Sequence, residues 1–212
     1  MQLYNKEMGK KIFAHTWYIY PLAIGLITVL WFWGFEAFHQ PTAHQSLTIF
    51  FATNIKKESF AKDIRVNNYE REKLREVNTP HSLPTSSGYY SKLDMYLSNS
   101  DILILDEKTI DDFKNYKDRF LVDIPSDIQN EYYSDFTDYY LYEDENHETH
   151  SYGIRIKKKG EASYFTDYMT FDEGYDYYAC LSLSSQNLGK ISGEKNSKFD
   201  NALTFMKYLL KA

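Results

Sequence analysis

The stretch KLDMYLSNSDILILDE, residues 92–107, decides the fold class. It begins as the end of a helix and passes through a short polar turn. It then continues as an aliphatic run, DILIL (101–105), which ends in the carboxylates Asp106 and Glu107. Such a run is typical of a strand buried on both faces. A helix that leads directly into a buried strand indicates an α/β domain.

Segments on both sides repeat this alternation. Three further runs predict strands: LTIFFAT (47–53), the alternating and therefore half-exposed YGIRIKKKG (152–160), and YYACLSLS (177–184). Two predict helices: EKTIDDFKNYKD (107–118) and the amphipathic FDNALTFMKYLLK (199–211). Because uncharged strands are typical of parallel sheets covered on both faces, we expect one α/β domain with a largely parallel sheet over residues 47–212.

Two parts of the chain are harder to assign. The charged stretch 56–78 indicates a helix, but IRV (64–66) inside it leaves a further strand open. Residues 78–88 are rich in Pro, Ser and Thr and predict a loop. Residues 126–150 are acidic and rich in tyrosine, and no element is predicted for them.

The clearest single signal is an apolar segment near the N-terminus. No formally charged residue lies between Lys11 and Glu36, and aromatic residues gather at both ends of this stretch. About 20 apolar residues in a helix span the ~30 Å of a bilayer core. Residues 16–36 are therefore predicted to be a transmembrane signal anchor, with aromatic belts at the two interfaces.

The flanking charges give an orientation. Lys6, Lys10 and Lys11 precede the span, and no Lys or Arg follows it until Lys56. The positive-inside tendency predicts a cytoplasmic tail (1–15), a linker (37–46) and an extracytoplasmic domain on a single-pass cell-membrane protein. A cleaved signal peptide is the alternative. It is disfavoured because the segment is long and the residues after it make a poor cleavage site.

Composition excludes several kinds of partner. From Glu36 onward the chain holds 21 Lys and Arg against 29 Asp and Glu, which are the whole-chain 24 and 30 less three Lys and one Glu, so its net charge is about −8. This charge argues against nucleic acid as a partner. Cys180 is the only cysteine, so no disulfide can form within the chain, and it is expected to be a buried core residue.

The order of four segments resembles that of a known protein family. LTIFFATN, KLDMYLSNSDILIL, YGIRI and the ending YYACLSLSSQNLGK…FDNALTFMKYLL resemble the extracellular solute-binding proteins of ABC importers. The resemblance implies an α/β lobe, a small polar solute as ligand, and an ABC permease or another membrane protein as partner. It carries no signature motif.

One departure from that family matters. Such proteins clamp a ligand between two lobes, whereas only about two dozen residues lie between Pro125 and Tyr152, where the chain would cross into a second lobe. The chain therefore resembles a single lobe. A single lobe lacks the enclosure that buries most of a small ligand's surface.

Candidate ligand contacts follow from the strand ends. In open α/β sheets ligands sit beyond the carboxyl ends of the strands, which selects Thr53 and Asn54 after one strand and Asp106 and Glu107 after another. Asp106 has an alternative role as the cap of the helix that follows it.

Two further polar groups are candidates. Ser184, Ser185 and Asn187 form a hydroxyl and amide cluster after the last strand, and ordinary turn chemistry is their alternative. His147 and His150 stand three apart in an acidic loop, which suggests a weak metal site or simply a solvated loop. We expect no metal and no cofactor.

No nucleophile elbow or phosphate loop is found, so we expect no enzyme. The tyrosines that gather at residues 132–142 and 164–178 indicate a stacking or interaction surface, or else compositional bias. The leading hypothesis is a membrane-anchored, non-catalytic, solute-binding-like protein. The alternatives are a ligand-free scaffold module and a metal-dependent hydrolase.

Overall fold

The computed structural model describes residues 10, 11, 14, 16–42, 44–57, 60, 74–112, 117–189, 191 and 200–211. The chain divides into two compact units, Met1–Gln40 and Pro41–Ala212. Most of the charged stretch 56–78, including IRV, lies outside the described residues.

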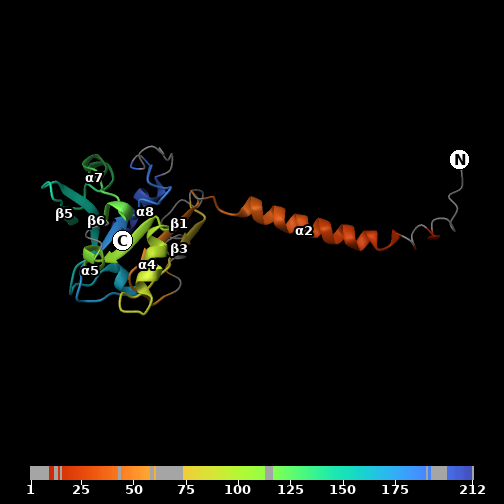
Figure 1. Cartoon of the computed structure of the whole chain (residues 1–212), viewed down its shortest axis with the longest axis horizontal. Helices are drawn as coiled ribbons and strands as arrows, with labels where there is room; N and C mark the ends of the chain where they lie inside the picture. Colours follow the sequence, from red (N-terminus) through yellow and green to blue (C-terminus); the bar gives the residue numbers. More distant parts are fainter. Residues whose placement is uncertain are drawn as a thin grey trace. The chain divides into compact units, whose positions relative to one another are not determined.

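The N-terminal unit contains helix α2 (Ile19–His39), labelled in Figure 1. Its 21 residues correspond to roughly 30 Å of helix, and none of them is buried. By length and composition α2 is a candidate membrane anchor or signal sequence. The helix continues to His39, so the first residues of the expected linker are helical.

The second unit is built on a six-stranded sheet with the order β3-β1-β4-β8-β6-β5. The strands are β1 (Ser46–Phe51), β3 (Glu76–Asn78), β4 (Ile102–Asp106), β5 (Tyr139–Glu143), β6 (Thr149–Lys157) and β8 (Tyr177–Leu181). A separate two-stranded sheet pairs β2 (Asn54–Ile55) with β7 (Met169–Thr170). The unit is therefore an α/β fold.

The expectation of a largely parallel sheet is wrong, because the sheet is mixed. β1 runs parallel to both β3 and β4, whereas β8 is antiparallel to its neighbours β4 and β6, and β5 is antiparallel to β6. Helices cover both faces of the sheet, so a central antiparallel strand is as apolar as a parallel one. Every residue of β8 is buried.

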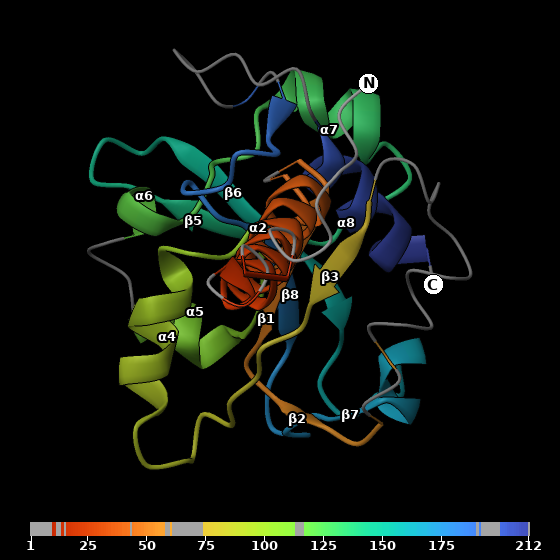
Figure 2. The same ribbon diagram turned by 90° about the vertical axis from the view of Figure 1, so that its right-hand side faces the viewer.

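Helices form the two outer layers (Figure 2). On one face, α4 (Tyr89–Leu97) and α5 (Glu107–Asp112) pack on a core that includes Phe50, Leu103 and Cys180. On the other face, α7 (Ser126–Tyr132) and α8 (Asn201–Lys211) pack on the larger core. Two short elements complete the unit: α6 (Lys117–Phe120) and the 3-10 helix η1 (Tyr164–Asp167).

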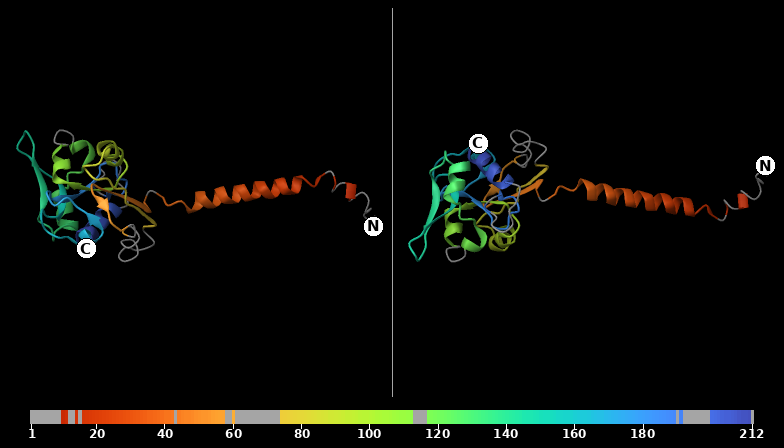
Figure 3. Two further views of the ribbon diagram at one scale, coloured as in Figure 1. Left: turned by 90° about the horizontal axis from the view of Figure 1, so that it is seen from below. Right: turned by 90° about the horizontal axis from the view of Figure 1, so that it is seen from above.

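The acidic, tyrosine-rich region 126–150 is ordered as α7 and β5, and β5 forms a hairpin with β6 (Figure 3, teal). The strand predicted from YGIRIKKKG (152–160) begins and ends three residues earlier than expected, as β6, and is not half-exposed. It lies between β8 and β5, and its residues Ser151 to Ile154 are all buried.

Candidate functional site

Three strands end together at one end of the sheet. β1 and β4 are parallel, and β6 shares their direction because both β4 and β6 are antiparallel to β8. Their last residues Phe51, Asp106 and Lys157 therefore lie at one end of the sheet, which we call the carboxyl end. This is where ligands bind in open α/β sheets.

Thr53 and Asn54 lie at the carboxyl end, but both make structural contacts within the fold. Thr53 is fully buried, and its Oγ1 donates a hydrogen bond to the carbonyl oxygen of Thr170 at 2.8 Å. Asn54 is exposed and pairs with Thr170 in the small β2–β7 sheet. Both residues thus join β1 to β7.

Asp106 caps a helix. Its side chain is buried and accepts hydrogen bonds from the backbone N–H of Thr109 at 2.9 Å and from Thr109 Oγ1 at 2.6 Å. These are the bonds expected of a residue at the start of α5. Asp106 also borders a small cavity of about 130 Å³ together with Tyr90 and Tyr177. Glu107 is exposed, and its N–H donates to the carbonyl oxygen of Asp176.

Ser184, Ser185 and Asn187 lie at the opposite end of the sheet, because β8 is antiparallel to β4. Asp101 links the segments at this end of the sheet. Its carboxylate accepts hydrogen bonds from Ser185 Oγ at 2.5 Å, from Asn187 Nδ2 at 3.0 Å and from the backbone N–H of Thr48 at 2.8 Å. Ser184 Oγ contacts Ser182 Oγ at 2.8 Å. The cluster therefore ties β1, β4 and the loop after β8.

Replacing Asp101 with alanine should lower the free energy of unfolding by about 2 kcal/mol, because three donors lose their acceptor. Asp94→Ala on the exposed side of α4 is the matched control and should change stability little. Urea denaturation of the full chain in detergent measures both. Equal effects of the two substitutions would contradict the role given to Asp101.

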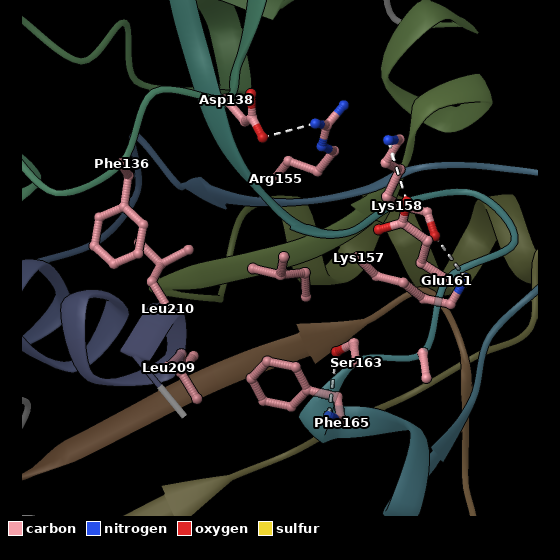
Figure 4. A pocket seen from close by; sticks show the side chains of 12 residues that line it. Phe136, Asp138, Arg155, Lys157, Lys158, Glu161, Ser163, Phe165, Leu209 and Leu210 are labelled. Atoms are coloured by element: carbon pink, nitrogen blue, oxygen red, sulfur yellow. Dashed lines mark hydrogen bonds and ion pairs between the residues drawn. The ribbon is translucent and has the colours of Figure 1, made fainter.

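A polar pocket with a volume of about 400 Å³ lies at the carboxyl end of β6. We call it the Lys157 pocket. Figure 4 shows its two sides: Arg155, Lys157 and Lys158 on one, and Phe136, Leu209 and Leu210 on the other. A polar side built from β6 thus faces an apolar side built mainly from the end of α8.

Two of the three cations in this pocket have carboxylate partners. The Arg155 guanidinium lies 2.7 Å from Asp138 and 3.2 Å from Asp176, and Lys158 Nζ lies 3.1 Å from Glu161. Burial of Arg155 opposes its charge, but the two carboxylates outweigh burial and raise the pKa of Arg155 above its ordinary value. These ion pairs hold the polar side in place.

Lys157 differs from its neighbours. The residue is 5% exposed, its Nζ donates to the carbonyl oxygen of Lys158 at 3.3 Å, and its ammonium lies 5.8 Å from the centroid of the Phe171 ring. Within the described part of the chain, no carboxylate forms an ion pair with it. A buried charge without a counter-charge costs free energy, which an anion in the pocket would offset.

The two histidines of the acidic loop do not converge on one site. His147 Nδ1 lies 2.5 Å from Glu143 Oε1, and His147 has a left-handed backbone (φ 65°). His150 Nδ1 instead lies 2.9 Å from Asp123 Oδ2, and this contact raises the pKa of His150. The ligand atoms of His150 lie close to those of Asp144 and Glu148.

The strand-end rule selected residues at the carboxyl end of the sheet but not the cations of the Lys157 pocket. Arg155, Lys157 and Lys158 stand in the run RIKKKG, a local excess of positive charge in an acidic domain. This excess of positive charge can be seen in the sequence. The direction of β6 is needed to place it at the carboxyl end of the sheet. Comparisons with protein-family models, curated proteins and solved structures found no match to this chain.

Proposed function

We propose that this protein is a membrane-anchored, non-catalytic binding domain that takes a small organic anion in the Lys157 pocket. The observation that carries the proposal is Lys157, a buried ammonium without a carboxylate partner among the described residues of a strongly acidic domain. α2, as a candidate anchor, supports the membrane location.

The two sides of the pocket favour an amphipathic ligand. An ammonium has three donors, and the known bond to the Lys158 carbonyl uses one of them. Phe136, Leu209 and Leu210 would contact the carbon skeleton of a carboxylate. The volume of about 400 Å³ is within the range of small-molecule sites.

The solute-binding role extends this proposal. The sequence resemblance favours an ABC permease or another membrane protein as the partner that receives the ligand. A scaffold module without a ligand remains the rival function. With that function, no bound anion would offset the charge of Lys157.

Replacing Lys157 with methionine should weaken anion binding strongly without harming the fold. We expect straight-chain carboxylates from acetate to octanoate to stabilise the full chain in detergent, increasingly with chain length. Loss of a hydrogen-bonded charge should weaken binding about 10- to 100-fold. The unliganded variant should be as stable as the wild type or more stable, since an unpaired buried charge is removed. Thermal unfolding with and without each carboxylate measures both effects.

Lys159→Met is the matched control, since Lys159 is exposed and does not line the pocket. It should bind carboxylates like the wild type. Equal binding by Lys157→Met and the wild type would refute the assignment of the site. A flat response of the wild type to every carboxylate would favour the scaffold module.

A further inference from the structure

A second group of side chains with ligand chemistry lies at the turn between β5 and β6, at the end of the sheet opposite the Lys157 pocket. Asp144 directly follows β5, Glu148 directly precedes β6, and His150 is the second residue of β6. One ligand atom from each residue can be chosen so that all three lie within 4.8 Å of one another. Two carboxylates and an imidazole thus converge from both sides of one hairpin.

Asp144 is held in place by the turn itself. Its Oδ1 accepts hydrogen bonds from the backbone N–H of Asn146 at 2.9 Å and of Glu148 at 2.8 Å. These two bonds fix the carboxylate in position, and its Oδ2 is left to face the other ligands.

His150 is oriented by a residue outside the group. Its Nδ1 lies 2.9 Å from Oδ2 of Asp123, in the segment before α7, and its Nε2 lies 3.7 Å from Asp144 Oδ2. If Nδ1 donates to Asp123, the lone pair of Nε2 faces the other two ligands. Histidines that bind metals nearly always give their second nitrogen to a carboxylate or carbonyl in this way.

Glu148 completes the group and is still available. Its side chain is exposed, and in the described parts of the chain no hydrogen bond or ion pair engages its carboxylate. Its free rotation allows all three ligand atoms to approach a common centre at the metal distance of about 2.0–2.2 Å.

We propose that Asp144, Glu148 and His150 bind a divalent transition-metal ion of the Zn²⁺ type, with Asp123 as the residue that positions His150. One imidazole nitrogen and two carboxylate oxygens suit Zn²⁺ and Co²⁺, whereas Ca²⁺ needs six to eight oxygen ligands. The ion would close the turn and link the hairpin to the segment around Asp123. Its remaining positions would hold water or a group from a partner.

The experiment titrates Zn²⁺ into the full chain, carrying no histidine tag, in detergent. Calorimetry gives the affinity, and Co²⁺ absorption gives the ligand geometry. We expect Zn²⁺ to bind in one-to-one ratio and to raise the melting temperature, and Ca²⁺ at the same concentration to have little effect. Glu148→Gln should weaken Zn²⁺ binding at least about tenfold, and His150→Gln about 100-fold.

Two variants separate this site from a simple ion pair. Asp123→Asn keeps a side-chain oxygen near His150 but should weaken Zn²⁺ binding about tenfold and shift the Co²⁺ spectrum. His147→Asn removes the other imidazole of the turn, and asparagine tolerates the left-handed backbone there. This control should bind Zn²⁺ like the wild type.

Several results would overturn the proposal. They are no Zn²⁺ binding by the wild type, unchanged binding by Glu148→Gln and His150→Gln, or a loss confined to His147→Asn. Circular dichroism of the metal-free variants excludes misfolding as the cause of a loss. Zn²⁺ binding and carboxylate binding are measured in separate experiments. Failure of the metal proposal therefore does not affect the proposed anion site at Lys157.

Discussion

Raising the pH from 10 to 12 should destabilise the domain strongly, because its buried tyrosines ionise at a higher pH when the domain is folded than when it is unfolded. Burial is the main cause that raises the pKa of both Tyr177 and Tyr178 to about 12, against 10.0 for a free tyrosine, and nearby carboxylates add to it. Both residues lie in β8, at 1% and 7% exposure.

The sign follows from proton counting. Above pH 10 the unfolded chain loses these two protons and the folded chain keeps them, so stability is complete below pH 10 and falls as the pH rises through the folded pKa. Each tyrosine contributes a slope of about 1.4 kcal/mol per pH unit, so the two together remove about 5 kcal/mol by pH 12. Burial also raises the pKa of Tyr89, Tyr133 and Tyr140, which steepens the loss. Total stability is typically about 5–15 kcal/mol.

Circular dichroism and phenolate absorbance, followed together against pH, test this expectation. The buried phenols should ionise well above pH 10, together with the loss of structure. Tyr178→Phe should reduce the slope by about one proton, and the contact it removes to Asp176 is long, at 3.5 Å. Ionisation of all tyrosines near pH 10, with the fold intact, would contradict the burial described here.

Gly153→Ala should lower the free energy of unfolding by about 3 kcal/mol, the upper end of the cost of overpacking. Gly153 lies in β6 opposite Cys180 of β8. An added Cβ would meet Cys180 Sγ at 2.7 Å, the Ala179 carbonyl oxygen at 3.1 Å and Tyr178 Cβ at 3.3 Å. Two central strands would have to separate, since the carbonyl group cannot rotate away.

A double-mutant cycle isolates the cause. Cys180→Ala removes the nearest clashing atom at the cost of a small cavity, about 1 kcal/mol. The double variant Gly153→Ala/Cys180→Ala should then be more stable than the sum of the single changes by about 1–2 kcal/mol. Denaturant unfolding of the four proteins provides the measurement. Simple additivity would show that the glycine is required for another reason.

The positions of the main elements could be predicted from local sequence patterns. The aliphatic run of β4, the apolar run of β8 and the helical spacing of α8 were each predicted within a few residues. The direction of β8 was not, because a strand covered by helices on both faces is apolar whichever way it runs. β5 was missed because Tyr139–Glu143 is rich in tyrosine and acid, and its pairing with β6 is a tertiary contact.

The same limit applies to the candidate site. The strand-end rule selected Asp106 correctly as a residue at the carboxyl end, and its alternative role as a helix cap is confirmed by the bonds to Thr109. Ser184, Ser185 and Asn187 were candidates because they form a hydroxyl and amide cluster after a strand. The antiparallel direction of β8 places them at the other end of the sheet. Among the described tyrosines of the two groups, Tyr133, Tyr140, Tyr177 and Tyr178 are buried in the core, a role that neither explanation considered. The others described there are partly buried.

β8, the last strand in the described part of the chain, occupies the middle of the sheet, and this has a consequence for biosynthesis. β1 and β4 lead the sequence, but the inner side of β4 has no neighbour until Tyr177–Leu181 arrives. During synthesis this side of β4 therefore remains an unpaired flank until β8 has been made. An unpaired apolar strand edge favours aggregation of nascent chains. Truncation before residue 177 would leave that flank open permanently, so a stop codon there should yield aggregated material and not a smaller domain.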